Sequence, residues 1–201
     1  MITMRFGKSR KTTIVLLSLF FLQPLQAQDF RTIKNTTPVF AISSNLLYDA
    51  ATGMNLGVEF RLNNRLTLKL PATYNPWTFD RNRKLKFILA QPELRGWLCE
   101  PFSGHFFGLQ GHYAQFNAGR IGTDYMQKHR YEGSLYGGGI VYGYQFYLAP
   151  RWSLEASIGL GYAYLDYTVY KCETCGEYIK SENKNYFGPT KADLSLIYIL
   201  K

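Results

Sequence analysis

The chain has 201 residues, a length that suits one domain with or without a processing segment. Hydrophobic residues make up 46% of it and aromatic residues 16%, which excludes a disordered chain. The net charge of +9 would suit nucleic-acid binding, but four of these charges come from Arg5, Lys8, Arg10 and Lys11, so we expect no nucleic-acid partner.

The N-terminal 27 residues have the three-part pattern of a secretory signal peptide. The four cations precede an apolar run over residues 14–22, and the small residue Ala27 ends the segment. Nine apolar residues are too few to cross about 30 Å of hydrocarbon as a helix, although an uncleaved anchor helix is the alternative. We expect cleavage after Ala27, a short N-terminal lead over residues 28–38, and a β-barrel over residues 39–201. The mature chain would have 174 residues and a net charge of +5.

From residue 39 onward, apolar and polar residues alternate with the two-residue period of β-strands. The period predicts eight strands, over residues 39–48, 54–62, 66–74, 85–98, 105–117, 135–148, 152–167 and 186–200. Short connections at residues 63–65, 99–104 and 149–151 alternate with long ones at 75–84, 118–133 and 168–185. This pattern predicts an all-β, eight-stranded antiparallel up-and-down transmembrane β-barrel, a monomer in the outer membrane of a Gram-negative cell envelope. The long connections would face outward, and both termini would face the periplasm.

A soluble calyx of the lipocalin type is the main alternative fold. Its apolar face would point inward and its charged face outward. Here the apolar face is rich in aromatic residues and almost free of charge, as at Tyr136, Ile140, Tyr142, Tyr144 and Phe146. Such a face would form a very large apolar patch in water, so we expect it to contact lipid. Aromatic residues gather near both ends of the strands, as expected for two interfacial belts: Phe102, Phe106, Phe107, Phe146, Tyr147, Trp152 and Tyr198 at one end, and Tyr48, Tyr74, Trp77, Phe79, Tyr164, Tyr167 and Tyr186 at the other.

The opposite face would point into the lumen and carries eight charged residues, four of each sign. They are Glu59, Arg61, Lys69, Glu93, Arg95, Glu155, Lys191 and Asp193. The interior of an eight-stranded barrel is filled by side chains, so we expect these charges to pair and to close the lumen, with a gated pore as the alternative. Glycines at 137, 139, 143, 159 and 161 would make room for Arg61 or Arg95, or leave a small cavity. Strict alternation also turns Leu85, Phe87 and Leu89 inward, which a bulge near Pro92 would reverse.

The residues that could support catalysis or metal binding form no familiar motif. His105, His112 and His129 lack the spacing of metal ligands, and none has the serine two residues later that outer-membrane lipid-modifying enzymes place at their rim. We expect no enzyme activity, no metal and no cofactor, and we expect His112 to point inward beside Gln110. Cys172 and Cys175 supply only two of four zinc ligands and predict a local disulfide in the last long loop, which leaves Cys99 unpaired.

Three stretches, over residues 91–97, 104–117 and 143–162, are similar to a family of uncharacterised Bacteroidetes outer-membrane β-barrels, known as a domain of unknown function. The resemblance covers about residues 40 to 201. It implies an outer-membrane barrel without an established activity or known catalytic residues. Members are often encoded near fimbrial or surface-adhesin components, which implies a role in attaching or assembling surface structures.

Two functions remain open at this point. The first is a non-enzymatic barrel with a closed lumen, embedded in outer-membrane lipid, whose surface loops bind a cell-surface protein or polysaccharide. The second is a lipid-active enzyme or a small-solute channel, which would need a cavity that opens onto the membrane.

Overall fold

The computed structural model describes residues 38–79, 83–119, 129–171 and 176–200. They form an all-β structure with one short helix, α2 (Leu46–Ala50). The expected signal peptide lies outside the described residues. The strands are β1 (Phe40–Asn45), β2 (Met54–Arg61), β3 (Leu66–Asn75), β4 (Thr78–Phe79), β5 (Arg83–Ala90), β6 (Glu93–Trp97), β7 (Gly104–Gly119), β8 (His129–Ala149), β9 (Trp152–Lys171) and β10 (Tyr178–Leu200).

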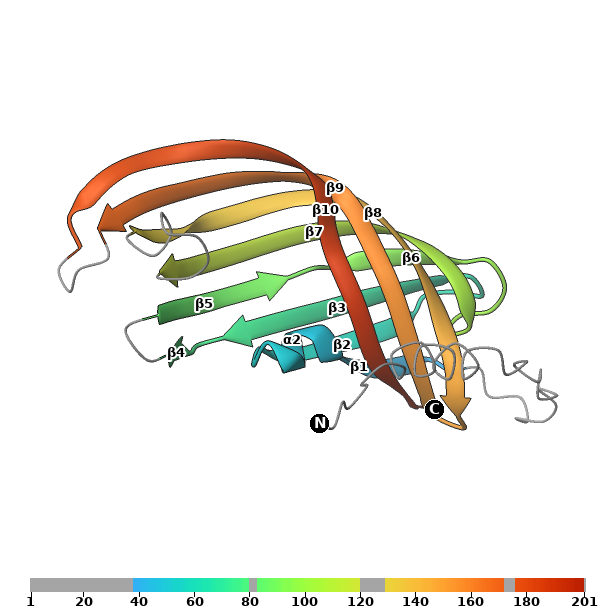
Figure 1. Ribbon diagram of the computed structural model, residues 1–201. Helices are drawn as coiled ribbons and strands as arrows, with labels where there is room; N and C mark the ends of the chain where they lie inside the picture. The colour runs from blue at the N-terminus through green and yellow to red at the C-terminus, as the bar shows by residue number, and fades with distance from the viewer. Residues whose placement is uncertain (1–37, 80–82, 120–128, 172–175, 201) are drawn as a thin grey trace, which may run out of the picture. The chain divides into compact units, whose positions relative to one another are not determined.

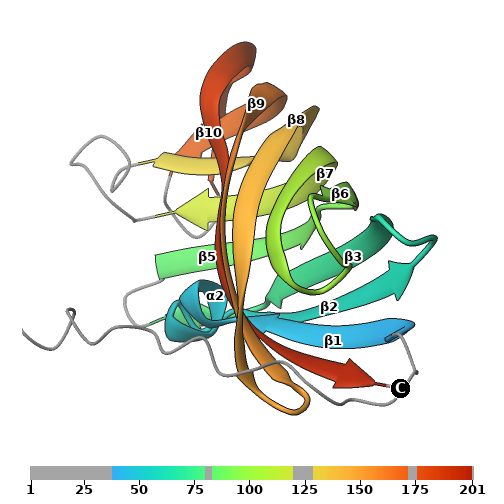
Figure 2. The ribbon, with the colours of Figure 1, turned by 90° about the vertical axis from the view of Figure 1, so that its right-hand side faces the viewer.

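These strands close into a ring of eight antiparallel strands, in which each strand pairs with its neighbours in the sequence (Figures 1 and 2). β1 closes the ring because it pairs with β2 on one side and with β10 on the other. β5 and β6 count as one strand, since both lie between β3 and β7. The two-residue β4 pairs only with β5. The expected number of strands and their up-and-down order are therefore confirmed.

The bulge expected near Pro92 is absent, so that prediction was wrong. The register of this strand is the same on both sides of the proline, because Ala90 pairs with Ala72 and Glu93 pairs with Lys69. Proline removes one backbone donor, but the carbonyl of Pro92 still accepts a hydrogen bond from the Gly111 N–H at 2.9 Å. The residues at 85, 87 and 89 therefore keep their inward direction.

The last two long connections are much shorter than expected. β7 continues to Gly119 and β8 begins at His129, while β9 continues to Lys171 and β10 begins at Tyr178. The polar side chains in these segments suggested loops. The backbone ladder continues through them because β-pairing uses main-chain groups, and the flanking β-branched and aromatic residues favour strands. In Figure 1 the parts of β8, β9 and β10 nearest the longer connections extend as a curved sheet.

The two faces of the ring have opposite character. Large apolar side chains point outward and are exposed, for example Leu109 at 64% and Ile140 at 63%. Of the aromatic residues expected near the strand ends, Phe107, Phe146, Trp152 and Tyr74 are exposed on the outer face, and Tyr147 and Trp77 are also exposed. Phe102 and Phe106 were expected in an aromatic belt at the membrane interface, and this prediction was wrong, because both side chains are buried. No helix within the described ranges is long and apolar enough to span a membrane.

Candidate functional site

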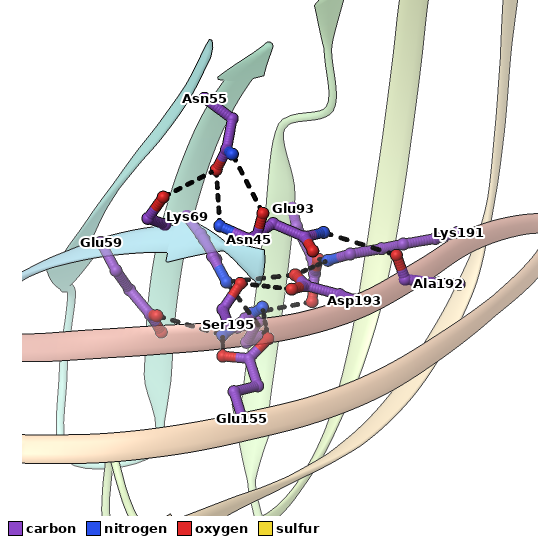
Figure 3. Close-up of polar contacts among 12 residues, drawn as sticks. Asn45, Asn55, Glu59, Lys69, Glu93, Glu155, Lys191, Ala192, Asp193 and Ser195 are labelled. Atoms are coloured by element: carbon purple, nitrogen blue, oxygen red, sulfur yellow. Dashed lines mark hydrogen bonds and ion pairs between the residues drawn. The ribbon is translucent and has the colours of Figure 1, made fainter. Parts of the chain in front are cut away.

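The ring interior contains a cluster of charged side chains and, next to it, a cavity. We use "charged cluster" for seven residues from five strands: Glu59, Lys69, Glu93, Arg95, Glu155, Lys191 and Asp193. All seven are at most 7% exposed. Figure 3 shows that Lys69, Glu93 and Glu155 point toward one another from separate strands. The alternation of strand residues puts these side chains inside, and closure of the ring brings them within bonding distance.

Arg95 of β6 is the centre of the charged cluster. Its Nη1 and Nη2 donate to both carboxylate oxygens of Glu155 on β9, at 2.8 and 2.7 Å. Nε donates to Glu93 at 2.7 Å, and Nη1 also donates to Glu59 at 3.1 Å. The guanidinium lies 4.3 Å from the centre of the Phe106 ring. One planar fork therefore binds three carboxylates on three strands, a geometry that lysine could not reproduce.

Two lysines complete the connection between the walls of the ring. Lys69 Nζ on β3 lies 3.1 Å from Glu155 and 3.4 Å from Asp193 on β10. Lys191 Nζ on β10 binds Glu93 on β6 and lies 3.5 Å from Asp193. Each lysine therefore contacts carboxylates on at least one strand that is not its neighbour, so the charged cluster crosslinks opposite sides of the ring.

Neutral side chains donate further hydrogen bonds to two of the carboxylates, Glu59 and Asp193. The Thr67 hydroxyl donates to Glu59 at 2.5 Å and accepts from Trp97 Nε1 at 2.9 Å. The Ser195 hydroxyl donates to Asp193. Buried charges are tolerated when they are paired and hydrogen-bonded, and each carboxylate of the charged cluster meets that condition.

Arg61 was expected in this network and does not belong to it. Its guanidinium turns toward the β2–β3 connection, where it donates to the Asn63 carbonyl at 3.0 Å and to Asn64 Oδ1 at 2.6 Å. The physical reason is its position at the last residue of β2, from which the long side chain reaches the carbonyl and amide oxygens of the turn. The charged cluster therefore contains four carboxylates and three cations.

Apolar side chains close the ring on the side of the short connections. Phe102 lies in the connection between β6 and β7 with a φ of 66°, and only 4% of it is exposed. It packs against Ala41 and Ile197, and its ring centre lies 6.2 Å from that of Trp97. Trp97 in turn contacts Phe106, with ring centres 4.9 Å apart. The connection thus folds an aromatic side chain into the end of the ring, beneath the charged cluster.

A cavity of about 520 Å³ lies on the other side of the charged cluster, toward the longer connections. Its lining includes the apolar Phe87, Leu89, Phe116, Leu135 and Leu165 and the polar Tyr48, Gln91, His112, Lys184, Tyr186 and Thr190. The inward direction of residues 87 and 89, which strict alternation indicated, gives the cavity part of its apolar wall. Tyr48 and Tyr186, expected in an aromatic belt, line this cavity instead.

Glycines make room for interior side chains, but not for the arginines that the sequence suggested. A Cβ at Gly143 would lie 2.4 Å from Phe106, and one at Gly137 would lie 2.7 Å from His112 Nε2. A Cβ at Gly159 would lie 2.9 Å from Gln110 Nε2. The inward direction of His112 and Gln110 is confirmed, since both are buried.

The remaining candidate residues lie apart from the charged cluster or outside the described residues. His105 lies on the outer face, where its Nδ1 is 2.8 Å from the Tyr142 hydroxyl. Within the described ranges, no three His, Cys, Asp or Glu residues are grouped to hold a metal ion. Cys99 is a free, exposed thiol, and the expected disulfide between Cys172 and Cys175 lies outside the described residues. The sequence pattern did not predict that Tyr48 and Lys184 line the cavity, and only the register of β10 with β9 reveals Lys184.

Comparison with protein families gives a match along almost the whole chain. Residues 13–200 match the family described as "Protein of unknown function (DUF3575)". The chain belongs to this family. The expected membership of a domain of unknown function is thereby confirmed. Comparisons with curated proteins and with solved structures gave no match.

Proposed function

We propose that this DUF3575 protein is a non-enzymatic outer-membrane β-barrel, exported by a cleaved signal peptide, whose lumen is closed and whose outward strands and connections bind a surface partner. The observation that carries the proposal is the inverted polarity of the ring. Its interior holds seven charged side chains, whereas its outer face is covered by exposed leucine, isoleucine and aromatic residues. A bilayer accommodates such an outer face, and a closed ring leaves few backbone groups unpaired in lipid.

Two layers support a closed lumen. The charged cluster joins the walls through contacts such as Arg95–Glu155 and Lys69–Asp193. Beneath it, Phe102 and Phe106 fill the end of the ring with apolar atoms. A water-filled channel would need a continuous path past both layers. We therefore favour a structural and binding role over a channel.

The outer ends of β8, β9 and β10 are the surface that we assign to partner binding. The exposed polar residues Ser181, Glu182 and Asn183 lie there on β10. Extended hairpins beyond a membrane-embedded ring suit contact with a protein or a polysaccharide at the cell surface. A role in attaching or assembling surface structures, and the assignment to Bacteroidetes, rest on the sequence resemblance and belong to the same proposal.

Membrane insertion is tested by extraction and by gel mobility. The protein should stay in the membrane fraction at alkaline carbonate, and unheated and heated samples should migrate differently, because closed β-ladders resist detergent. Release by carbonate, or a soluble monomer without detergent, would contradict the proposal.

Orientation is tested with a membrane-impermeant maleimide. In a variant with Cys172→Ser and Cys175→Ser, the exposed Cys99 at the short-connection end should react only after the cells are permeabilised. The matched control adds Cys99→Ser and Ser181→Cys and should react in intact cells. The reverse pattern would invert the topology.

Partner binding is tested by crosslinking in intact cells. The tagged protein should retain a specific partner, and replacement of residues 178–183, which leaves the cavity-lining Lys184 in place, by a Gly-Ser segment of equal length should release it. The folded gel band should remain. Equal recovery with both proteins would show that this surface does not bind the partner.

The alternative function is a lipid-active enzyme or a small-solute channel, and the observation that favours it is the cavity of about 520 Å³. A steady ion current through the purified protein would favour the channel.

A further inference from the structure

The cavity beside the charged cluster has the composition of a ligand site. Its volume of about 520 Å³ lies within the range of small-molecule pockets. Two phenylalanines and three leucines supply an apolar wall, at Phe87, Leu89, Phe116, Leu135 and Leu165. No aspartate or glutamate is found among the described residues that line it. The cavity therefore suits an apolar molecule, and no carboxylate belongs to its described lining.

His112 presents an unsatisfied polar group to this cavity. The side chain is only 6% exposed, and neither ring nitrogen has a hydrogen-bond partner among the described residues. Buried polar groups normally have partners, and a neutral imidazole has one donor and one acceptor. Gly137 on β8 leaves the space that the ring occupies. A ligand that accepts a hydrogen bond would satisfy the donor nitrogen of His112.

Lys184 brings a cation to the same cavity. Across neighbouring strands, His112 pairs with Gly137, and Gly137 pairs with Ala163. Lys184 pairs with Leu165, which is the next inward residue of β9 after Ala163. His112 on β7 and Lys184 on β10 therefore lie at neighbouring levels of the ring, where His112 is buried and Lys184 is exposed. Lys184 forms no ion pair with another described residue. His112 and Lys184 thus line one cavity whose described lining contains no carboxylate.

The wall between β10 and β1 offers a route into the cavity. β1 pairs with β10 only from Ser195 onward, and above that point β10 pairs with β9 alone within the described residues. Tyr48 of α2 lines the cavity, as do Tyr186 and Thr190 of β10. On this side the cavity is therefore bounded by side chains instead of a continuous hydrogen-bonded ladder. Phe187, which is 83% exposed, marks the outer face of β10 at this level.

We propose that this cavity binds a slender apolar anion of the fatty-acid class, with the carboxylate between His112 and Lys184 and the acyl chain against the leucine and phenylalanine side chains. The proposal does not depend on partner binding at the hairpins. It goes beyond the proposed function because it assigns a ligand to the interior of the ring.

The test uses a photoreactive dodecanoic acid with a diazirine in the middle of its chain. The full mature protein in detergent is irradiated with this probe, and mass spectrometry locates the modified residues. The expected crosslinks fall on inward residues such as Ala114, Leu135 and Leu165, and they should saturate as the probe concentration rises. Dodecanoic acid should displace the probe, and dodecanol should displace it less well. Crosslinks that occur only on outward residues such as Leu160 would overturn the proposal, and so would equal displacement by the alcohol.

Variants separate the cavity from nonspecific lipid contact. Leu165→Trp fills the cavity and should lower probe affinity roughly tenfold, because bound ligand and indole cannot share the space. Ala163→Leu is a second variant with the same purpose, and the unheated gel band shows which of the two folds. Wild-type affinity in a folded cavity-filling variant would overturn the proposal.

The charge is tested separately. Lys184→Gln should weaken binding of the acid about threefold, the size of a partly exposed ion pair, and leave binding of dodecanol unchanged. Lys86→Gln, on the outer face of β5, is the matched control and should change neither. Equal effects of the two lysine variants on acid binding would show that Lys184 does not recognise the carboxylate.

Discussion

Replacing Arg95 by methionine should be the most damaging single change in the charged cluster. Arg95 binds Glu59, Glu93 and Glu155, and it is the only cation within 4.0 Å of the Glu59 carboxylate among the described residues. Methionine keeps the length of the side chain and removes its charge. Glu93 would retain Lys191 and Glu155 would retain Lys69, but Glu59 would keep only the Thr67 hydroxyl.

One buried carboxylate would thus lose its counterion, which costs about 3–5 kcal/mol. With an m-value of about 2 kcal/mol per molar urea, the unfolding midpoint should fall by about 1.5–2.5 M. The assay is equilibrium unfolding in lipid vesicles, followed by the fraction of protein in the unheated, folded gel band. Adding Glu59→Gln to Arg95→Met removes the unpaired charge and should recover part of the loss.

The matched control is Arg130→Met. Arg130 pairs with Glu132 at 2.9 Å, but these side chains are 30% and 49% exposed. Water screens such a pair, so the loss should stay below about 1 kcal/mol, or about 0.5 M urea. Equal midpoints for Arg95→Met and Arg130→Met would refute the conclusion that the charged cluster stabilises the ring.

Three further predictions concern closure and packing of the interior. Phe102→Ala should destabilise the ring by roughly 3–4 kcal/mol in the same urea assay, since it removes a buried aromatic side chain, and a loss below about 1 kcal/mol would contradict the closing role. Gly143→Ala should lower the urea unfolding midpoint, because the added Cβ would lie 2.4 Å from Phe106. Gly111→Ala is the control and should leave the midpoint unchanged, because the nearest atoms to its Cβ lie at 3.9 Å. Similar midpoints for the two variants would contradict the packing argument. The purified protein in a planar bilayer should carry no steady current, and a reproducible conductance that changes in Lys69→Met would identify the charged cluster as a channel lining.

Much of the fold follows from the two-residue period alone. Alternation along 54–62 or 135–148 fixes which side chains share a face, because successive residues of a strand point to opposite sides. The number of strands, their order and the inward direction of seven of the eight expected charges follow from it. Leu85, Phe87 and Leu89 obey the same rule, and the expected bulge is absent because apolar side chains such as Phe87 and Leu89 also line the interior cavity.

The partners of those inward charges depend on tertiary structure. Arg95 and Glu155 are 60 residues apart, and their contact depends on how far each strand is shifted along its neighbours around the ring. The alternation of inward and outward residues contains no information about that shift. For the same reason, the sequence could not show that Arg61 turns to the connection or that Phe102 closes one end.

Where the strand register is regular, the sequence by itself therefore determined which residues face inward, and the closed ring decided which of them meet. The register shift between Pro189 and Lys191 reverses the alternation on β10, so the inward direction of Lys184 and Tyr186 depended on the tertiary structure. Facing direction is a local property of the strand backbone, set by each residue's position in the alternation. Contacts across the interior, including the approach of His112 and Lys184 to one cavity, require the stagger of β7 through β10, including the register shift between Pro189 and Lys191. That stagger arises only when all the strands pair and the ring closes.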